Sequence, residues 1–186
     1  MTTMIILVVA ALLVLYAISI YNRLVSNRNL VKEGWSGIDV QLRRRADLIP
    51  NLIETVKGYA AHEKGVLEEI SEARARSLGA QGVGDQAAAE KGLSAALGRL
   101  FAVAEAYPEL KADANFRDLQ AQLATIEEDV QSARRYYNGA ARNQNILIES
   151  FPSNLVANYF RFEPAAFFEI GDEAARNVPK VDFGAR

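Results

Sequence analysis

The sequence has no cysteine, one histidine and one tryptophan among its 186 residues. Without cysteine the chain can form no disulfide and has no thiolate nucleophile. The lone His62 lies next to Glu63, and adjacent side chains on a helix point about 100° apart, so the two cannot chelate a metal together. No nucleophile motif and no phosphate-binding glycine pattern is present. These absences predict a protein that is not an enzyme and has no cofactor and no metal.

An excess of charge of one sign is also missing. The chain has 21 lysines and arginines against 23 aspartates and glutamates, a formal net charge of −2. These charges are distributed evenly, whereas nucleic-acid-binding proteins gather basic residues on one face. The sequence therefore predicts no nucleic acid among the partners.

Charge is absent altogether from residues 4–21 (MIILVVAALLVLYAISIY). As a helix this run would be about 27 Å long, close to the ~30 Å hydrocarbon core of a bilayer. A cleaved signal peptide is the alternative, but residues 1–3 contain no lysine or arginine and no A-x-A site ends the run. We therefore predict an uncleaved transmembrane helix that contacts membrane lipid.

The charges that flank this run predict its orientation. Arg23, Arg28 and Lys32 follow it, whereas only the α-amino group precedes it. By the positive-inside rule the N-terminus lies outside and the remainder of the chain in the cytoplasm. The lack of cysteine agrees with a reducing compartment, but many exported proteins also lack it. A periplasmic or extracellular domain is the alternative.

Beyond residue 37 the apolar residues recur at spacings of three and four, which is the period of helices, and no segment alternates like a strand. The last series, from Phe116 to Phe151, keeps this spacing over about five heptads, as in the seam of a coiled coil. The predicted fold class is all-α: an N-terminal transmembrane helix, then an antiparallel four-helix-type bundle of long helices, then a short C-terminal helix.

Glycine and proline predict where these helices bend and end. Gly34 and Gly37 are candidate hinges, and Pro50 is expected to kink the first helix without ending it. Glycines after residue 78 predict a loop, with Asp85 as the N-cap of the next helix. The expected organisation is a stub (1–3), a transmembrane helix (4–21), a juxtamembrane helix or hinge (22–37), a helical bundle (38–170) and a flexible tail (171–186).

Three consecutive arginines, Arg43, Arg44 and Arg45, are a candidate cluster for lipid or for ion pairs. In a continuous helix they lie roughly 30 to 35 Å beyond the span, too far for headgroup contact. In that arrangement they are expected to pair with nearby carboxylates such as Asp39, Asp47 or Glu54. If the chain instead bends back near Gly34 or Gly37, each arginine approaches anionic lipid.

Two further groups are candidate contacts with another copy or a partner. Gln144 falls on the apolar seam itself, within a polar stretch that includes Asn138 and Asn145, where a buried polar group can fix register or oligomeric state. The alternative is a helix end wetted by solvent. The second group is a cluster of aromatic residues, read either as a plug over the bundle or as an exposed docking or membrane-touching surface. Its members are Phe151, Tyr159, Phe160, Phe162, Phe167 and Phe168.

Three long segments carry a resemblance to a known family. They are residues 35–75 (WSGIDVQLRRRADLIPNLIETVKGYAAHEKGVLEEISEARA), 100–138 (LFAVAEAYPELKADANFRDLQAQLATIEEDVQSARRYYN) and 151–169 (FPSNLVANYFRFEPAAFFE). Together with the apolar run and the YNRLV that follows, they closely resemble the LemA family of bacterial membrane proteins. The resemblance implies an N-terminal transmembrane helix, a cytoplasm-facing antiparallel helical bundle and no established enzymatic activity. It also implies a single-pass protein of the bacterial inner (cell) membrane.

Two function classes follow from these observations. The first is a non-enzymatic membrane scaffold that self-associates through the flanks of its bundle to organise or shape the membrane. The second is a membrane-tethered adaptor or regulator that recruits another membrane protein through the C-terminal aromatic segment. An enzyme with an unrecognised site is a weaker third. The expected partners are membrane lipid through residues 4–21 and further copies of the chain, or a foreign membrane protein.

Overall fold

The computed structural model describes residues 1–169, and in this part every regular element is an α-helix. This confirms the helical fold class for the described residues. The elements are α1 (Thr2–Lys57), α2 (Lys64–Gly79), α3 (Gly82–Ala104), α4 (Pro108–Ala112), α5 (Ala114–Glu149) and α6 (Ser153–Tyr159). The tail predicted at 171–186 lies outside the described residues.

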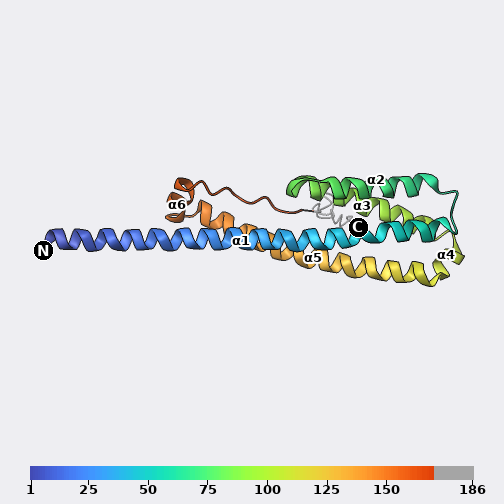
Figure 1. Ribbon diagram of the computed structural model, residues 1–186, viewed down its shortest axis with the longest axis horizontal. Coiled ribbons are helices and arrows are strands. Elements are labelled where there is room, and N and C mark those ends of the chain that lie inside the picture. Colours follow the sequence, from blue (N-terminus) through green and yellow to red (C-terminus); the bar gives the residue numbers. More distant parts are fainter. Residues whose placement is uncertain (170–186) are drawn as a thin grey trace, which may run out of the picture.

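The first helix, α1, is unbroken over 56 residues (Figure 1). It continues through 22–37 and past Pro50, so the hinge considered near Gly34 or Gly37 is wrong. Gly34 is buried and has another role: a Cβ there would lie 3.0 Å from the Cα of Tyr137 on α5. Because that distance is shorter than a normal contact, glycine allows α1 and α5 to approach closely at this point.

The two parts of α1 differ in burial. Large apolar side chains are exposed up to Ile18, as Leu7 and Leu13 illustrate with exposed fractions of 70% and 64%. From Leu24 onward α1 buries one side against the other helices. Among the described residues α1 is the one helix long and apolar enough to cross a membrane, judged by length and composition.

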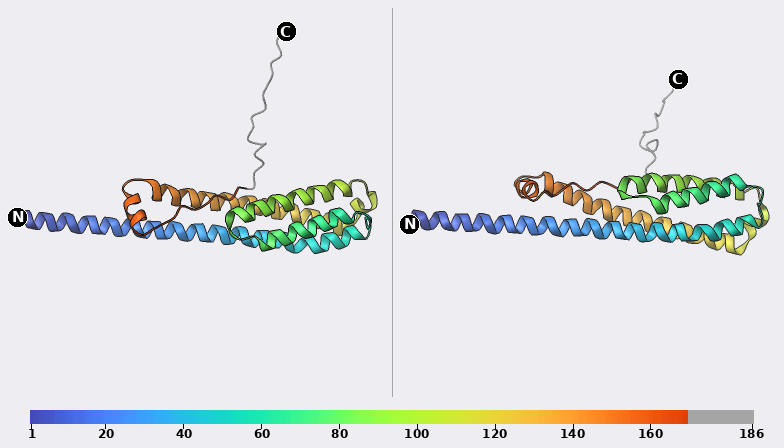
Figure 2. Two further views of the ribbon diagram at one scale, coloured as in Figure 1. Left: turned by 90° about the horizontal axis from the view of Figure 1, so that it is seen from above. Right: turned by 45° about the horizontal axis from the view of Figure 1, so that its top comes forward.

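The remaining helices cover the second part of α1 in two ways. The long helix α5 runs back beside α1, while α2 packs on α1 and on α3 (Figures 1 and 2). We call the part in which α2 and α3 accompany α1 and α5 the helical half. The other part, nearer the exposed end of α1, holds α6 and residues 160–169, a turn at Phe160 and Arg161 followed by an extended segment; we call residues 160–169 the strap. We call this part the strap half.

Helix lengths explain why a strap is needed. At 1.5 Å per residue α5 is about 54 Å long, α3 about 34 Å and α2 about 24 Å, from their 36, 23 and 16 residues. The α1–α5 pair therefore extends roughly 20 to 30 Å beyond α2 and α3. The eight residues after the turn, 162–169, reach about 26 Å when fully extended. The strap thus has the length required to cover the exposed part of this pair (Figure 1).

The turns of the helical half show where sequence reasoning missed local structure. The α2–α3 turn ends at Gly82, whose φ of 82° favours glycine, and α3 begins there. The sequence predicted Asp85 as the N-cap of this helix. That prediction is wrong, because Asp85 lies in the first turn of α3 and Gln81 occupies the N-cap position. Asp113 is the N-cap of α5, and its carboxylate accepts the backbone N–H of Phe116 at 2.9 Å. The five-residue helix α4 before it is too short to give a periodic signal.

Two tyrosines connect these turns. The Tyr59 hydroxyl donates to Asp113 at 2.9 Å, and the Tyr107 hydroxyl donates to Glu63 at 3.0 Å. The hydrogen bond to Asp113 raises the pKa of Tyr59, and the bond to Glu63 raises the pKa of Tyr107. Each bond joins the α1–α2 turn to a later turn of the chain. At the end of the helical half that is farthest from the N-terminus, side-chain hydrogen bonds therefore connect the turns in addition to the backbone.

Candidate functional site

The strap is held to α5 by two asparagine side chains. Asn145 accepts the backbone N–H of Ala165 at 2.8 Å and donates to its carbonyl oxygen at 3.0 Å. Asn138 accepts the N–H of Phe168 at 2.9 Å and donates to its carbonyl at 3.1 Å. Each amide thus pairs with both polar groups of one strap residue, as a neighbouring strand would. We call these two pairs the asparagine clamps.

The two clamps are separated by nearly the same distance along α5 and along the strap. Asn138 and Asn145 are seven residues apart, which places them on one face of α5 about 10.5 Å apart along its axis. Ala165 and Phe168 are three residues apart, about 10 Å in an extended chain. The strap runs antiparallel to α5, so Asn145 meets Ala165 and Asn138 meets Phe168. The polar stretch that suggested a solvated helix end therefore contains the groups that hold the strap.

The last clamp places Phe168 in a buried aromatic site. Its ring is fully buried and lies 5.6 Å from the ring of Trp35 on α1. Trp35 in turn lies 5.6 Å from the ring of Tyr137 on α5, and the Tyr137 hydroxyl donates to the carbonyl of Ala166 at 2.7 Å. Burial raises the pKa of Tyr137, so the hydroxyl keeps its proton for this bond. Phe168 thus completes a core between α1 and α5.

The start of the strap is fixed by the turn after α6. Arg161 has a positive φ of 56°, and the N–H groups of Arg161 and Phe162 bond back to Asn158 and Ala157 at 3.2 and 2.9 Å. This is the Schellman pattern that ends many helices, with arginine where glycine is usual. The turn directs the Phe162 ring inward, 5.9 Å from the ring of Tyr21 on α1. Phe162 is consequently buried with Leu24 and Ala157.

Four large apolar side chains around α6 remain exposed. Their exposed fractions are 79% for Phe151, 61% for Leu155, 81% for Tyr159 and 52% for Phe160. The rings of Tyr159 and Phe160 lie 5.0 Å apart, and Phe160 lies 4.7 Å from the ring of Tyr21. We call these four residues the α6 patch. The aromatic cluster thus divides into buried rings that hold the strap and exposed rings that face outward.

The candidate contact residues divide in the same way. Phe160 and Phe167, with exposed fractions of 52% and 43%, are available at the surface. Phe162, Phe168 and Gln144 are buried within this chain, so none can touch a partner while the strap is in place. Gln144 lies in the core of α5, and its side-chain oxygen has no hydrogen-bond partner among the described residues. Its effect on register or oligomeric state stays a prediction.

The three consecutive arginines all form ion pairs, but with different partners. Arg43 pairs with Asp39 at 3.0 Å, as the sequence suggested. Arg44 pairs with Asp129 of α5 at 3.5 Å. Arg45 is buried and pairs with Glu90 of α3 and Glu127 of α5, both at 3.3 Å. Because these carboxylates are distant in the sequence, the expected partners Asp47 and Glu54 were the wrong ones.

Glu90 is the centre of a buried polar cluster that sequence reasoning missed. Its fully buried carboxylate accepts hydrogen bonds from Arg45, from Gln86 at 3.2 Å and from the Ser77 hydroxyl. A signal was present, because Glu90 is three residues before Leu93 and Arg45 is three residues after Leu42. Charges at such seam positions are expensive to bury unless they meet. The cluster therefore joins α1, α2, α3 and α5.

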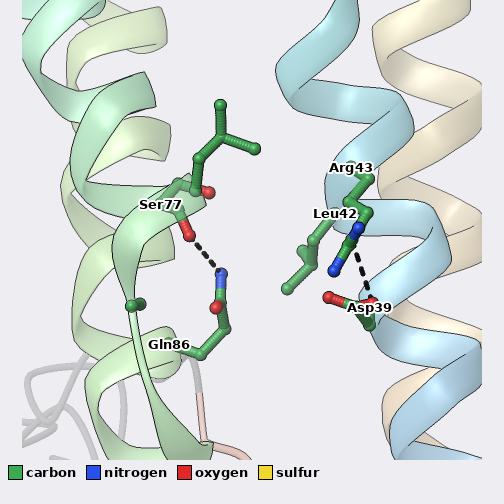
Figure 3. A pocket seen from close by; sticks show the side chains of 7 residues that line it. Asp39, Leu42, Arg43, Ser77 and Gln86 are labelled. Atoms are coloured by element: carbon green, nitrogen blue, oxygen red, sulfur yellow. Dashed lines mark hydrogen bonds and ion pairs between the residues drawn. The ribbon is translucent and has the colours of Figure 1, made fainter.

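A cavity of about 190 Å³ lies beside this cluster, between α1 and the α2–α3 turn. Figure 3 shows Asp39, Leu42 and Arg43 on one wall and Ser77 and Gln86 on the other. Gln86 donates to the Ser77 carbonyl at 3.1 Å, so the polar groups of this wall bond to each other. Within residues 1–169 no group of three or more histidine, aspartate and glutamate side chains is placed to hold a metal ion. The polar lining groups are thus paired within the protein, Asp39 with Arg43 and Gln86 with Ser77.

Comparison with known proteins gives relatives for almost the whole chain. Two magnetosome proteins, MamQ 1 and MamQ 2 of Paramagnetospirillum magneticum, are each 27% identical to it, covering 87% of this chain and 68% of theirs. Protein LemA of Metamycoplasma hominis is 24% identical, covering 87% of this chain and 72% of its own. The names of these relatives state no enzymatic activity. The family model described as LemA family matches residues 34–183, and the chain therefore belongs to the LemA family.

Proposed function

We propose that this chain is a single-pass membrane protein whose helical body is a rigid, non-enzymatic scaffold that self-associates on the membrane. One observation carries the proposal: α1 continues without a break from its exposed apolar part into the buried core. An exposed apolar helix of this length is unfavourable in water but matches a bilayer. Because the same helix then enters the core, the body is attached to the membrane without a flexible linker.

For the remaining architecture we propose an antiparallel four-helix-type bundle, with the N-terminus outside the inner membrane and the body in the cytoplasm. Arg23, Arg28 and Lys32 just beyond the apolar part support this orientation. Labelling an introduced cysteine at Val40 with a membrane-impermeant maleimide, in intact cells and in lysed cells, tests it. Labelling in lysed cells alone is expected. Labelling in intact cells would place the body outside the cytoplasm.

Self-association needs a free surface, because α5 already uses its apolar seam against α1. A groove of about 430 Å³ lies between α3 and α5 and contains Leu97, Gly98, Phe101 and Leu123. Leu97 and Leu123 are themselves buried, whereas Gly98 is exposed and Phe101 is partly exposed. We propose that a second copy packs its own flank against this groove, extending contacts along the membrane plane.

Two glycines of α3 provide a matched test of this contact. A Cβ added at Gly98 or at Gly92 meets nothing within 4 Å, so either position accepts a larger side chain within one chain. Gly98→Arg fills the groove, whereas Gly92→Arg lies about 120° away around the helix. Both changes raise helix propensity equally.

The full-length variants would be reconstituted into vesicles, cross-linked and imaged by cryo-electron microscopy. We expect oligomers for the unmodified chain and Gly92→Arg, and mostly single copies for Gly98→Arg. Single copies of the unmodified chain on undistorted membranes would rule out the scaffold. Oligomers of Gly98→Arg would rule out the groove as the contact.

The adaptor remains a second candidate because Phe167 is 43% exposed beside the buried Phe168. An adaptor predicts a stoichiometric foreign membrane protein bound to single copies. Phe167→Ala should abolish that complex without unfolding the strap, because the ring makes little use of the core. Leu78→Ala, at a similarly exposed residue with a fraction of 49% on α2, is the control. Equal binding by both variants would exclude the strap as the docking segment.

A further inference from the structure

We propose that the α6 patch rests in the headgroup layer of the same membrane that α1 crosses, as a second and independent membrane contact. The proposal rests on the proposed function in one respect, namely that the apolar part of α1 spans the bilayer. It adds a named surface with its own occupant, a lipid–water interface. The patch is the set defined above: Phe151, Leu155, Tyr159 and Phe160.

The position of α6 along α1 is the first argument. The core beneath α6 includes Ile20, Tyr21, Leu24 and Val25 of α1. The exposed apolar part of α1 ends at Ile18, only three residues before Tyr21, which is about 4.5 Å along the helix. In all views α6 lies at the end of the body that faces the apolar part of α1 (Figures 1 and 2). The patch therefore continues a surface that is already apolar.

The thickness of the headgroup layer is the second argument. A bilayer of about 40–45 Å with a ~30 Å hydrocarbon core has a polar layer of roughly 5 to 8 Å on each side. On α1 this corresponds to about three to five residues. If the hydrocarbon core ends near Tyr21, the polar layer extends to about Val25. These are the residues on which α6 packs, so α6 lies at headgroup depth.

The chemistry of the patch is the third argument. From Ser153 to Tyr159 α6 has no charged side chain. Tyrosine is enriched at membrane interfaces because its ring is apolar and its hydroxyl polar, as in Tyr159. The two phenylalanines and the leucine of the patch are residue types that interfacial helices bury at the boundary of headgroups and acyl chains. Arg161 flanks it in the sequence and Arg28 of α1 lies 5.2 Å from the Phe162 ring, but Glu149 and Glu163 also flank it. The balanced charges favour apolar insertion over attraction to anionic lipid.

A protein on this surface is the less favoured occupant. It would have to displace the lipid that surrounds α1 at the depth of Ile20 to Val25, where α6 packs. Lipid headgroups and upper acyl chains already fill this space around a membrane-spanning helix. The patch therefore fits a lipid surface better than a foreign helix or a second copy.

The absence of cysteine makes a direct test possible, because any introduced cysteine is the sole label site. Leu155→Cys, Leu13→Cys and Val40→Cys replace residues with similar exposed fractions of 61%, 64% and 50%. Each full-length variant would carry an environment-sensitive fluorophore in vesicles of palmitoyl-oleoyl phosphatidylcholine, at less than one chain per vesicle. Quenching by lipids brominated near the headgroup or near the chain end reports depth, and iodide reports exposure to water.

We expect the Leu155 label to be quenched several-fold more by shallow than by deep bromines, and the Leu13 label to show the reverse. The Val40 label, about 28 Å beyond Tyr21 along α1, should respond to iodide alone. If bromine quenches the label at position 13 but not the label at position 155, the second contact is overturned and the membrane span stands. A Leu155 label shielded from both bromine and iodide would overturn it in favour of a protein. If bromine does not quench the label at position 13, the membrane span and the membrane contact of the α6 patch are both overturned.

Discussion

The helical half and the strap half cover the same pair of helices by different means. In the helical half, α2 and α3 supply mainly aliphatic side chains such as Ile70 and Leu93, and a buried ion-pair cluster joins the helices. In the strap half a single extended segment supplies Phe162 and Phe168, and asparagine amides replace the ion pairs. A helix satisfies its own backbone groups, whereas an extended segment needs partners for them. A core covered by a short extended segment therefore needs side chains such as the asparagine clamps to pair with the backbone of that segment.

The largest expected effect breaks the helical half. Arg45→Ala leaves the Glu90 carboxylate buried without its cation, which costs about 3–5 kcal/mol of unfolding free energy. Urea unfolding followed by circular dichroism measures this loss. Arg44→Ala is the control, because its exposed pair with Asp129 contributes less than about 1 kcal/mol. Equal losses for the two variants would contradict the central role assigned to Glu90.

Next in size is the loss of the strap anchor. Phe168→Ala removes a fully buried ring between α1 and α5 and should cost about 3 kcal/mol. Because the clamps and ring contacts of the strap are with α5 and α1, hydrogen exchange should accelerate most in residues 160–169 and much less in α2. Phe167→Ala, at the partly exposed neighbour, should change little. Uniform acceleration throughout the chain would mean that the two halves unfold as one unit.

The clamps themselves should contribute less. Asn138→Ala or Asn145→Ala leaves a strap N–H and C=O unpaired, at a cost of about 1–3 kcal/mol each. Asn138→Asp keeps the acceptor but loses the donor and should fall between alanine and the native residue. Asn143→Ala, on an exposed residue of the same stretch, is the control. Exchange rates of the Ala165 and Phe168 amides report each clamp directly, and unchanged rates would show that packing alone holds the strap.

One change should stabilise the strap half. Arg161 occupies a left-handed position that costs a non-glycine residue about 1–2 kcal/mol. Arg161→Gly removes this strain, and part of the gain is lost to the greater freedom of glycine in the unfolded chain. We expect a net stabilisation of about 0.5–1 kcal/mol in urea unfolding. Destabilisation would show that the arginine side chain contributes more than its backbone strain costs.

The smallest effect concerns pH at the far end of the helical half. The N–H of Phe116 and then the Tyr59 hydroxyl lower the pKa of Asp113 below its ordinary 3.8. Because the folded value is depressed, this contribution is complete above pH 3.8 and is lost as pH falls through the folded pKa. Tyr59→Phe should raise the pKa of Asp113 in a carboxylate NMR titration. Tyr136→Phe is the control, and identical titrations of the two variants would contradict the bond.

Periodicity in the sequence was sufficient for the long helices but not for what joins them. The spacing of apolar residues located α5 and the buried side of α1, because each repeats over many turns. The strap has no period, and its partners Asn138 and Asn145 are 20 to 30 residues away, so the polar stretch looked like a helix end. The Arg45–Glu90 pair joins residues 45 positions apart, a pairing that local pattern does not contain.

If α1 crosses the bilayer as proposed, its unbroken course makes the protein a lever. From Tyr21 to Lys57 it extends about 54 Å, and transmembrane helices tilt on average by about 20°, an angle that changes with bilayer thickness. A rod of this length tilted by 20° displaces its far end sideways by roughly 18 Å. Thinning or thickening of the membrane by a few ångströms would thus swing the turns at Tyr59 and Asp113 by a much larger distance. The tip of the molecule would then act as an amplified gauge of bilayer thickness.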